Sequence, residues 1–316
     1  MKGTTMANKK ILVIGSSNMD AVLTLSRVPN AGENVTDEGG LAYVPGGRGG
    51  NAAVTVAKNG GDCVFSTRLG ADVQGQKLYS LYREVGINTA YIKIDPTFPT
   101  GLTVVMSENG GGRRSVIFPG ANGHLSRDNI AEAMEMRPDA VYIGFEVPFN
   151  TLLAACQMAE RIGVPVFADA AGISGSLPLD TLPRFEVFSP NEEEMGELSG
   201  IKPYGVDSSL RASLMICKRV KAKYIVIKLG ERGCFIYDGK YYDIVPAFGV
   251  KATDPTAAGD AFTAALTLEY MRNGGKIIPA ARYANAVAAI TVTRPGASQS
   301  IPDMAETQKF MGKHRS

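Results

Sequence analysis

Short apolar runs alternate with segments of helical periodicity along most of this chain, and this alternation constrains the fold most strongly. Strands are expected at residues 11–14, 141–143, 164–167, 187–188 and 224–227, and helices at 150–162 and 208–220. Residues 234–237 and 241–245 flank Asp238-Gly239-Lys240 and predict a hairpin. The order is typical of an α/β fold, doubly wound, with a mostly parallel central sheet and helices on both faces.

Two segments, residues 18–48 and 95–120, do not follow this alternation of strands and helices. Both are richer in alternating strand character and in glycine. We expect them to form a small β-sheet lid over one edge of the main sheet, where it would exclude water from a site beneath. No repeat or linker divides the sequence, so residues 1–316 are predicted to form one domain, with residues 1–9 as a disordered tail.

The composition excludes several classes of function. Hydrophobic residues make up 45% of the chain and charged residues 20%, and the net charge is only +2. Nucleic acid and anionic membranes are therefore not expected as partners. No apolar stretch approaches the roughly 20 residues that span a bilayer, and the N-terminus lacks the apolar core of a signal peptide. These features predict a cytoplasmic protein.

Cysteine and histidine offer little for metal or nucleophilic chemistry. The two histidines, His124 and His314, are too few for a histidine-based metal site, and they disfavour a Ser-His-Asp triad. The four cysteines lack paired spacing and have apolar neighbours, which predicts buried thiols in a reducing compartment; they are Cys63, Cys156, Cys217 and Cys234.

The clearest chemical signal is the run Asp254-Pro255-Thr256-Ala257-Ala258-Gly259-Asp260, which precedes an apolar helical stretch. Backbone amides at a helix N-terminus bind phosphate, and small side chains allow the phosphate to approach closely. The carboxylate of Asp260 would then lie near an incoming hydroxyl. An acidic residue in the first turn also stabilises any helix by about 0.3–1 kcal/mol. The three small residues before Asp260 favour a site that transfers a phosphoryl group to an alcohol.

Two further segments could bind a polar ligand. In extended backbone, Asn18 and Asp20 point to the same face and could hold the vicinal hydroxyls of a sugar, although a polar turn is an equal alternative. The glycine-rich run around Arg48 precedes an alanine-rich helix that ends at Gly60. The run is not a Walker A loop. We interpret it as a ligand-contacting loop, with a flexible loop carrying a solvated arginine as the alternative.

Polar residues also follow several of the predicted strands. Open α/β sheets bind ligands at the carboxyl ends of their strands. Each residue could instead cap a helix, and an asparagine followed three residues later by a glutamate is a variant of the capping box. Together they favour a site: Glu146, Asp169, Asn191, Glu194 and Lys228.

A series of segments, in chain order, resembles the signatures of the ribokinase-like carbohydrate kinases, the phosphofructokinase-B type. The resemblance covers about residues 11–302, and so many motifs in order are highly specific. The segments are Gly15-Ser16-Ser17-Asn18-Met19-Asp20, Gly46-Gly47-Arg48-Gly49-Gly50-Asn51, Gly120-Ala121-Asn122, Ser189-Pro190-Asn191-Glu192-Glu193-Glu194, Leu229-Gly230-Glu231-Arg232-Gly233, Ala257-Ala258-Gly259-Asp260 and Thr293-Arg294-Pro295-Gly296-Ala297.

This resemblance implies transfer of the γ-phosphate of ATP to a sugar hydroxyl, with D-ribose as the leading substrate. Deoxyribose, a fructose-type sugar or a nucleoside are the alternative acceptors. A family member that binds sugar without catalysis, as a sensor or scaffold, is a further alternative, against which the intact turn before Asp260 argues.

The resemblance also implies roles for individual residues. Asp260 would be the base, with the amides of Ala257, Ala258 and Gly259 as the anion hole. The sugar would be bound by Asn18, Asp20, Gly46, Gly47, Arg48, Asn51, Glu146 and Asp260, and ATP by Asn191, Lys228, Gly230, Glu231, Gly233 and Asn285. Glu194 would order magnesium through water, and Asp254, Thr256, Thr291, Gly296 and Ser300 would hold an activating potassium ion. A homodimer formed through the lid is also implied.

The chain departs from the family pattern at three places. Arg48 stands where lysine is usual, and a planar guanidinium is not equivalent to an ammonium. Residues 168–172, which contain Asp169, replace an Asn-Pro-Ala-Pro pattern, and Pro255 stands where threonine is more common. The first departure concerns the sugar, and the other two concern the phosphate end of the site.

Overall fold

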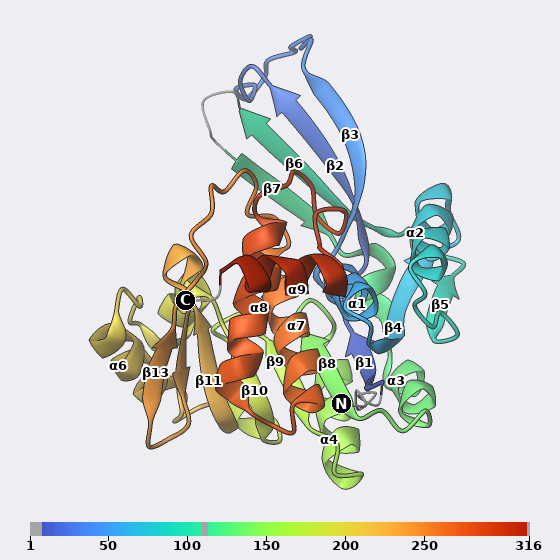
Figure 1. Cartoon of the computed structure of the whole chain (residues 1–316). Coiled ribbons are helices and arrows are strands. Elements are labelled where there is room, and N and C mark those ends of the chain that lie inside the picture. The colour runs from blue at the N-terminus through green and yellow to red at the C-terminus, as the bar shows by residue number, and fades with distance from the viewer. Residues whose placement is uncertain (1–7, 109–112, 315–316) are drawn as a thin grey trace.

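The computed structural model describes residues 8–108 and 113–314. The chain folds into a nine-stranded sheet covered by helices and a separate four-stranded sheet, which projects above the layered body (Figure 1). Residues 1–7 of the predicted tail lie outside the described residues. Lys9 is within them, and its ammonium lies 3.3 Å from the carboxylate of Asp139.

The large sheet confirms the predicted α/β fold. Its order is β13-β12-β11-β10-β9-β8-β1-β4-β5, and every neighbouring pair from β11 to β5 is parallel. Strands β12 and β13 extend the sheet as an antiparallel hairpin. The strands are β1 (Lys10–Ile14), β4 (Asp62–Gly70), β5 (Ile92–Asp95), β8 (Ala140–Gly144), β9 (Val166–Asp169), β10 (Phe185–Ser189), β11 (Ala222–Lys228), β12 (Cys234–Tyr237) and β13 (Tyr242–Val245).

Helices cover both faces of this sheet because its central strands are apolar on both sides. In β1, Ile11 and Val13 enter the core on one face, whereas Leu12 and Ile14 enter the core on the other. The first core contains residues of α1 (Arg48–Lys58), α2 (Val73–Glu84), α7 (Ala258–Arg272) and α8 (Ile277–Thr291). The second contains residues of α3 (Arg127–Met134), α4 (Phe149–Arg161), α5 (Glu192–Ser199) and α6 (Val206–Ile216).

The strand order determines where a ligand can bind. The chain builds the sheet outward from β1 in both directions, towards β4 on one side and β8 on the other. Such a switch point leaves a crevice at the carboxyl ends of the adjoining strands. The short helices η1 (Gly120–His124), η2 (Leu179–Thr181) and η3 (Gly230–Arg232), together with α9 (Met304–Lys313), complete the fold.

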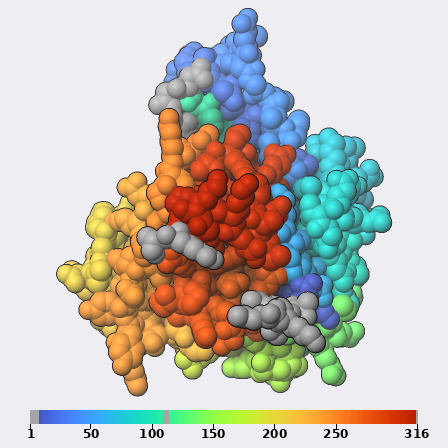
Figure 2. Space-filling view, in the orientation of Figure 1, coloured from blue at the N-terminus to red at the C-terminus, as the bar shows by residue number. Residues whose placement is uncertain are grey.

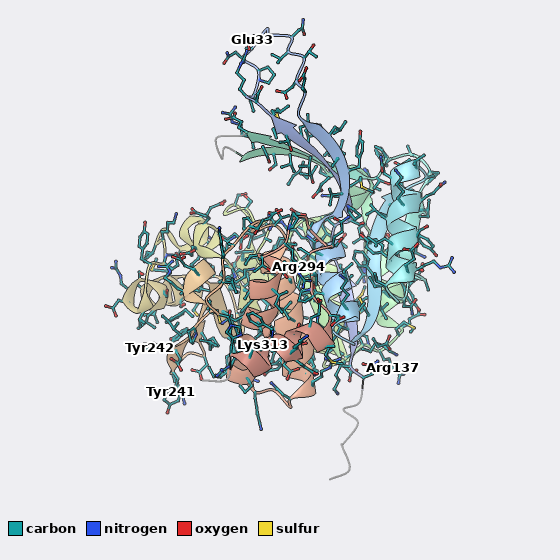
Figure 3. All side chains as sticks on the ribbon, turned by 45° about the horizontal axis from the view of Figure 1, so that its top comes forward. Glu33, Arg137, Tyr241, Tyr242, Arg294 and Lys313 are labelled. Carbon is teal, nitrogen blue, oxygen red and sulfur yellow. The ribbon has the colours of Figure 1, made fainter. Side chains whose placement is uncertain are left out.

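The small sheet has the order β3-β2-β6-β7, with a parallel pair in its centre and an antiparallel pair on each side. Its strands are β2 (Asn18–Leu25), β3 (Gly40–Gly46), β6 (Gly101–Glu108) and β7 (Arg113–Phe118), all within the two segments predicted to form a lid. Residues 109–112 of that prediction lie outside the described part. The lid arches away from the main body, with Glu33 at its far tip (Figure 3).

The structure corrects two predictions. The glycine-rich run is not a loop at residues 48–50, because α1 begins at Arg48. A Cβ on Gly49 would lie 2.5 Å from the carbonyl carbon of Gly15, so this glycine allows α1 to pack against the end of β1. Cys217 is exposed, unlike the other three cysteines, because it follows the last turn of α6 and precedes two basic residues. Within the described residues, no helix is long and apolar enough to cross a membrane.

Candidate active site

The N-terminal turns of α1 and α7 meet near the carboxyl ends of the central strands. Gly47, with φ 82°, precedes α1, and Ala257, with φ 64°, precedes α7. The two turns are joined by a hydrogen bond of 2.8 Å from Asn51 Nδ2 to Asp260 Oδ2. Each helix contributes a partial positive charge at its N-terminus. The pair of helix ends therefore favours an anion at this place.

Asp260 lies in the first turn of α7 and is only 7% exposed. Burial, and to a smaller extent nearby Asp169, raise its pKa, while Arg48, Asn51 and Lys228 lower it, and the net result is a pKa of about 7. A carboxyl group with a pKa near neutrality can accept a proton and release it at similar cost. Asp260 is therefore suited to act as a general base.

The backbone beside Asp260 leaves room for a ligand. A Cβ built on Gly259 would lie 3.7 Å from Lys228 Nζ, which is an ordinary contact distance. The described residues therefore do not require glycine here for their own packing. A phosphate that approaches the amides of this turn does benefit from the missing side chain.

An ion-pair cluster connects the ends of β1 and β8 with α1. Glu146 accepts a hydrogen bond of 2.6 Å from the Ser16 hydroxyl and one of 2.7 Å from Arg48 Nε. Arg48 Nη1 also lies 3.9 Å from Glu194 Oε1. Burial alone would lower the pKa of Arg48, but Asp260 and Glu146 raise it well above the ordinary value, so the guanidinium stays charged. The guanidinium of Arg48 therefore lies between the carboxylates of Glu146 and Glu194.

The polar pair Asn18 and Asp20 lies at the start of β2, in the small sheet. Asn18 is buried; its Nδ2 donates to Thr103 Oγ1 at 3.2 Å and its Oδ1 accepts from Asn122 Nδ2 at 2.7 Å. A Cβ on Gly46 would collide with the carboxylate of Asp20, so the glycine makes space for that side chain. Hydrogen bonds therefore hold Asn18 in place, and Gly46 leaves room for the carboxylate of Asp20.

The residues predicted to bind ATP lie mainly at the ends of β10 and β11. Asn191 and Glu194 form a capping box at the start of α5, in which the amide of each residue donates a 2.8 Å hydrogen bond to the side chain of the other. Lys228 closes β11 and donates from Nζ to Asp169 Oδ2 at 2.9 Å. Gly230 and Glu231 open η3, and Gly233 has a φ of 96° against the backbone of Val245 and Pro246. Asn285 projects from α8 and donates to the carbonyl oxygens of Val245 and Pro246.

The side chains predicted to hold potassium make hydrogen bonds within the protein. Asp254 accepts hydrogen bonds from the Thr256 amide at 2.9 Å, the Thr256 hydroxyl at 2.5 Å and the Gly296 amide at 3.0 Å. Thr291 instead donates to the Val287 carbonyl within α8. The Ser300 hydroxyl donates to the Ala297 carbonyl.

Two residues in this site had no predicted role. Ser16 binds Glu146, and Asn122 holds the turn after β1 by accepting from the Ser17 amide at 2.8 Å and donating to the Ser17 carbonyl. Asn122 belongs to one of the segments that carried the family resemblance, so its motif was a usable signal. Ser16 likewise belongs to one of those segments, Gly15-Ser16-Ser17-Asn18-Met19-Asp20, so its motif was also a usable signal.

Comparisons with known proteins show which family this chain resembles. The model of the pfkB family carbohydrate kinases matches residues 8–304. The chain is 30% identical over 306 residues to a ribokinase of Haemophilus influenzae, covering 96% of this chain and 98% of that protein. It is 27% identical over 303 residues to a deoxyribokinase of Salmonella typhi, covering 95% and 98%.

A solved structure of Arabidopsis thaliana ribokinase complexed with ribose and ATP superposes with a TM-score of 0.85, at 27% identity, covering 96% of this chain and 99% of that one. The family match over nearly the whole chain and the similarity to these relatives agree on one family. The chain belongs to the pfkB family of carbohydrate kinases and is a sugar kinase.

Proposed function

We propose that this enzyme transfers the γ-phosphate of ATP to the 5-hydroxyl of D-ribose, giving ribose 5-phosphate and ADP. The observation that carries the proposal is the buried carboxylate of Asp260, with a pKa of about 7, beside the open N-terminal turn of α7. The relative solved with ribose and ATP supports the choice of sugar and of phosphoryl donor.

The proposed reaction is a single displacement. The sugar oxygen forms a bond to the γ-phosphorus, and the bond from that phosphorus to the β–γ bridging oxygen breaks. ADP leaves with the electron pair, and the hydroxyl proton passes to Asp260. The amides of Ala257, Ala258, Gly259 and Asp260 stabilise the charge on the transferring group.

The sugar would lie between the lid and α1. Asn51 donates to Asp260, while its Oδ1 is buried and has no hydrogen-bond partner among the residues that the structure describes. A sugar hydroxyl can donate to that oxygen. Asn18, Asp20 and Glu146 supply further polar groups, and Gly46 and Gly47 leave space beside them. Arg48 would hold Glu146 and contact the substrate.

Magnesium would enter with the nucleotide. In the described part of the chain, no group of three or more histidine, cysteine, aspartate or glutamate residues could hold a metal ion by itself. Glu194 directs Oε1 towards Arg48 while Oε2 accepts from the Asn191 amide, so it fits a single water-mediated contact to an ion bound mainly by phosphates. When bound, magnesium would neutralise phosphate charge. Asn191, Lys228, Gly230, Glu231, Gly233 and Asn285 would surround ATP.

Potassium would lie behind the anion hole. Asp254, Thr256, Thr291, Gly296 and Ser300 offer oxygen atoms, which suit a hard cation. We expect potassium to raise kcat severalfold at fixed ATP and sugar concentrations, because a cation near the turn strengthens its positive field. Steady-state assays with potassium, or with choline as an inert cation, measure this. Equal values of kcat in both salts would contradict an activating potassium site.

A panel of acceptors tests the proposed function. ADP formation is measured with ribose, deoxyribose, fructose and adenosine at equal concentrations. We expect the highest kcat/KM for ribose. Preference for deoxyribose would support the alternative that the deoxyribokinase relative suggests, and preference for fructose or adenosine would overturn the ribose assignment. Sugar binding without ADP formation would favour a non-catalytic sensor or scaffold.

The pKa of Asp260 predicts the pH profile. Because the base must be deprotonated, kcat/KM should fall about tenfold per pH unit below roughly pH 7. The pH dependence of kcat/KM reports groups of the free enzyme, which is the state described here. A flat profile between pH 5.5 and 7.5 would contradict the role of this carboxyl group.

We also propose a homodimer formed through the lid. The edge strands β3 and β7 carry exposed apolar side chains, among them Leu41, Tyr43 and Phe118, and sheet edges of this kind favour pairing. Figure 2 shows the lid as a lobe that projects from the top of the main body. Light scattering should give twice the chain mass for the wild type and the monomer mass for Tyr43→Asp. A monomeric wild type would exclude this dimer.

We propose that the protein lies in the cytoplasm. ATP is the proposed phosphoryl donor, and the buried free thiols of Cys63, Cys156 and Cys234 suit a reducing compartment.

A further inference from the structure

A buried ion pair between Lys228 and Asp169 lies directly beside the proposed anion hole. The Lys228 side chain is 11% exposed and that of Asp169 is 1% exposed, with 2.9 Å between Nζ and Oδ2. The two residues end β11 and β9, so their side chains meet over β10, which lies between those strands. Burial of a lysine and an aspartate costs desolvation energy, and a buried ion pair is not a reliable source of stability. Stability alone therefore does not account for this pair.

The ammonium of Lys228 is directed towards the first turn of α7. It lies 3.7 Å from the position of a Cβ on Gly259 and 3.4 Å from the Thr263 hydroxyl, one turn further along the helix. The Thr263 hydroxyl lies 3.2 Å from that of Ser189, at the end of β10. These contacts place the ammonium between the end of the sheet and the amides of residues 258–260.

Asp169 holds Lys228 in this position and is itself fixed. Its Oδ1 accepts a hydrogen bond of 3.0 Å from the Ala171 amide, which leaves Oδ2 for Lys228. Lys228 lowers the pKa of both Asp260 and Glu194, whereas Asp169 raises both. The ammonium is therefore electrostatically close to the proposed base and to the carboxylate on the magnesium side.

We propose that Lys228 contacts the phosphoryl group during transfer, as a cation added to the anion hole, and that Asp169 is a positioning residue that holds its ammonium. This inference rests on the proposed function and deepens it. Lys228 keeps its proton throughout, since the hydroxyl proton passes to Asp260. Its charge offsets the negative charge that develops on the oxygen between the β- and γ-phosphorus atoms as the bond to the γ-phosphorus breaks.

Single and double variants separate this role from a structural ion pair. We expect Lys228→Met to lower kcat about 10²-fold with little change in the KM for sugar. Asp169→Asn should lower kcat less, because the ammonium remains. The double variant Asp169→Asn/Lys228→Met removes both charges and leaves neither one unpaired. If the pair is only structural, the double variant regains wild-type kcat; we expect it to remain as slow as Lys228→Met.

The opposite end of the same strands offers a matched control. Lys223 on β11 pairs with Glu186 on β10 at 2.6 Å, but this pair is more exposed and lies away from the turn. Lys223→Met should leave kcat unchanged. The acid limb of kcat/KM should move to higher pH in Lys228→Met and to lower pH in Asp169→Asn, following their opposite effects on Asp260. A Lys228→Met enzyme that keeps kcat within about threefold of the wild type would overturn the proposal.

A binding measurement makes the two proposals independently testable. The affinity for ADP with magnesium is compared with the affinity for ADP, magnesium and aluminium fluoride, which imitates the phosphoryl group in transfer. Lys228→Met should weaken the second affinity at least tenfold more than the first. Equal weakening would overturn the role of Lys228 and leave the proposed function standing, whereas failure of the wild type to phosphorylate any sugar would overturn the proposed function itself.

Discussion

Asp260→Asn should lower kcat by about 10³- to 10⁴-fold, the upper part of the range for loss of a general base. The amide has nearly the shape of the carboxyl group but cannot accept the hydroxyl proton. The proposed anion hole consists of backbone amides, so the substitution should leave it intact, and sugar binding should stay measurable by calorimetry. Turnover within tenfold of the wild type would show that another group accepts the proton.

The same variant should not be less stable at neutral or alkaline pH. Burial raises the pKa of Asp260 from its ordinary value of 3.8 to about 7, so between those values the folded protein holds a proton that the unfolded chain has lost. The contribution of the Asp260 carboxyl group to the free energy of unfolding of the wild type therefore decreases as the pH rises from about 4 to about 7. The free energy of unfolding of Asp260→Asn, relative to the wild type, should increase over that window. A variant that becomes relatively less stable would contradict this shift.

Asp207 provides a control for the general effect of an acidic residue at a helix N-terminus. It lies in the first turn of α6 and is exposed. Asp207→Asn removes an acidic side chain from the first turn of another helix. It should leave kcat at the wild-type value, because no reacting group lies near it in the proposed mechanism.

Arg48→Met should have the next largest effect, a loss of about 10²- to 10³-fold in kcat/KM. The guanidinium holds Glu146 at 2.7 Å and lies near Glu194, and it opposes the rise in the pKa of Asp260. Its removal should therefore also move the acid limb of the pH profile to higher pH. Arg48→Lys, which keeps the charge but not the planar fork, should recover part of the activity.

Arg68 is a matched control for this variant. Its Nε lies 2.7 Å from Asp95 Oδ2, the same length as the contact between Arg48 and Glu146. Arg68→Met breaks an equivalent ion pair outside the proposed site and should leave kcat/KM near the wild-type value. Similar losses in both variants would mean that Arg48 acts through the stability of the fold and not through the reaction.

The fold could be predicted from the sequence because its signals are local. The strand run at residues 11–14 and the hairpin around Gly239 depend on hydrophobic pattern and turn chemistry, and both appear as expected in β1, β12 and β13. The start of α1 was not predictable in this way. Gly49 and Gly50 weaken a helix by propensity, and only their packing against Gly15 and Tyr82 explains why the helix includes them.

The contacts among the candidate site residues could not be predicted from the sequence. Arg48, Glu146 and Glu194 are far apart in the sequence, and only the sheet order brings them together. The pairing of Lys228 with Asp169 likewise depends on β9 and β11 lying on either side of β10. Patterns within one segment cannot report such distances.

Transfer of labelled phosphate tests the central claim most directly. The enzyme is mixed in a single turnover with ATP labelled at the γ-phosphate, magnesium and ribose, and the labelled products are separated. We expect the wild type to place the label on the sugar, and Asp260→Asn to do so at least 10³-fold more slowly. Label released mainly as free phosphate, or transferred to sugar at similar rates by both proteins, would contradict the proposed mechanism.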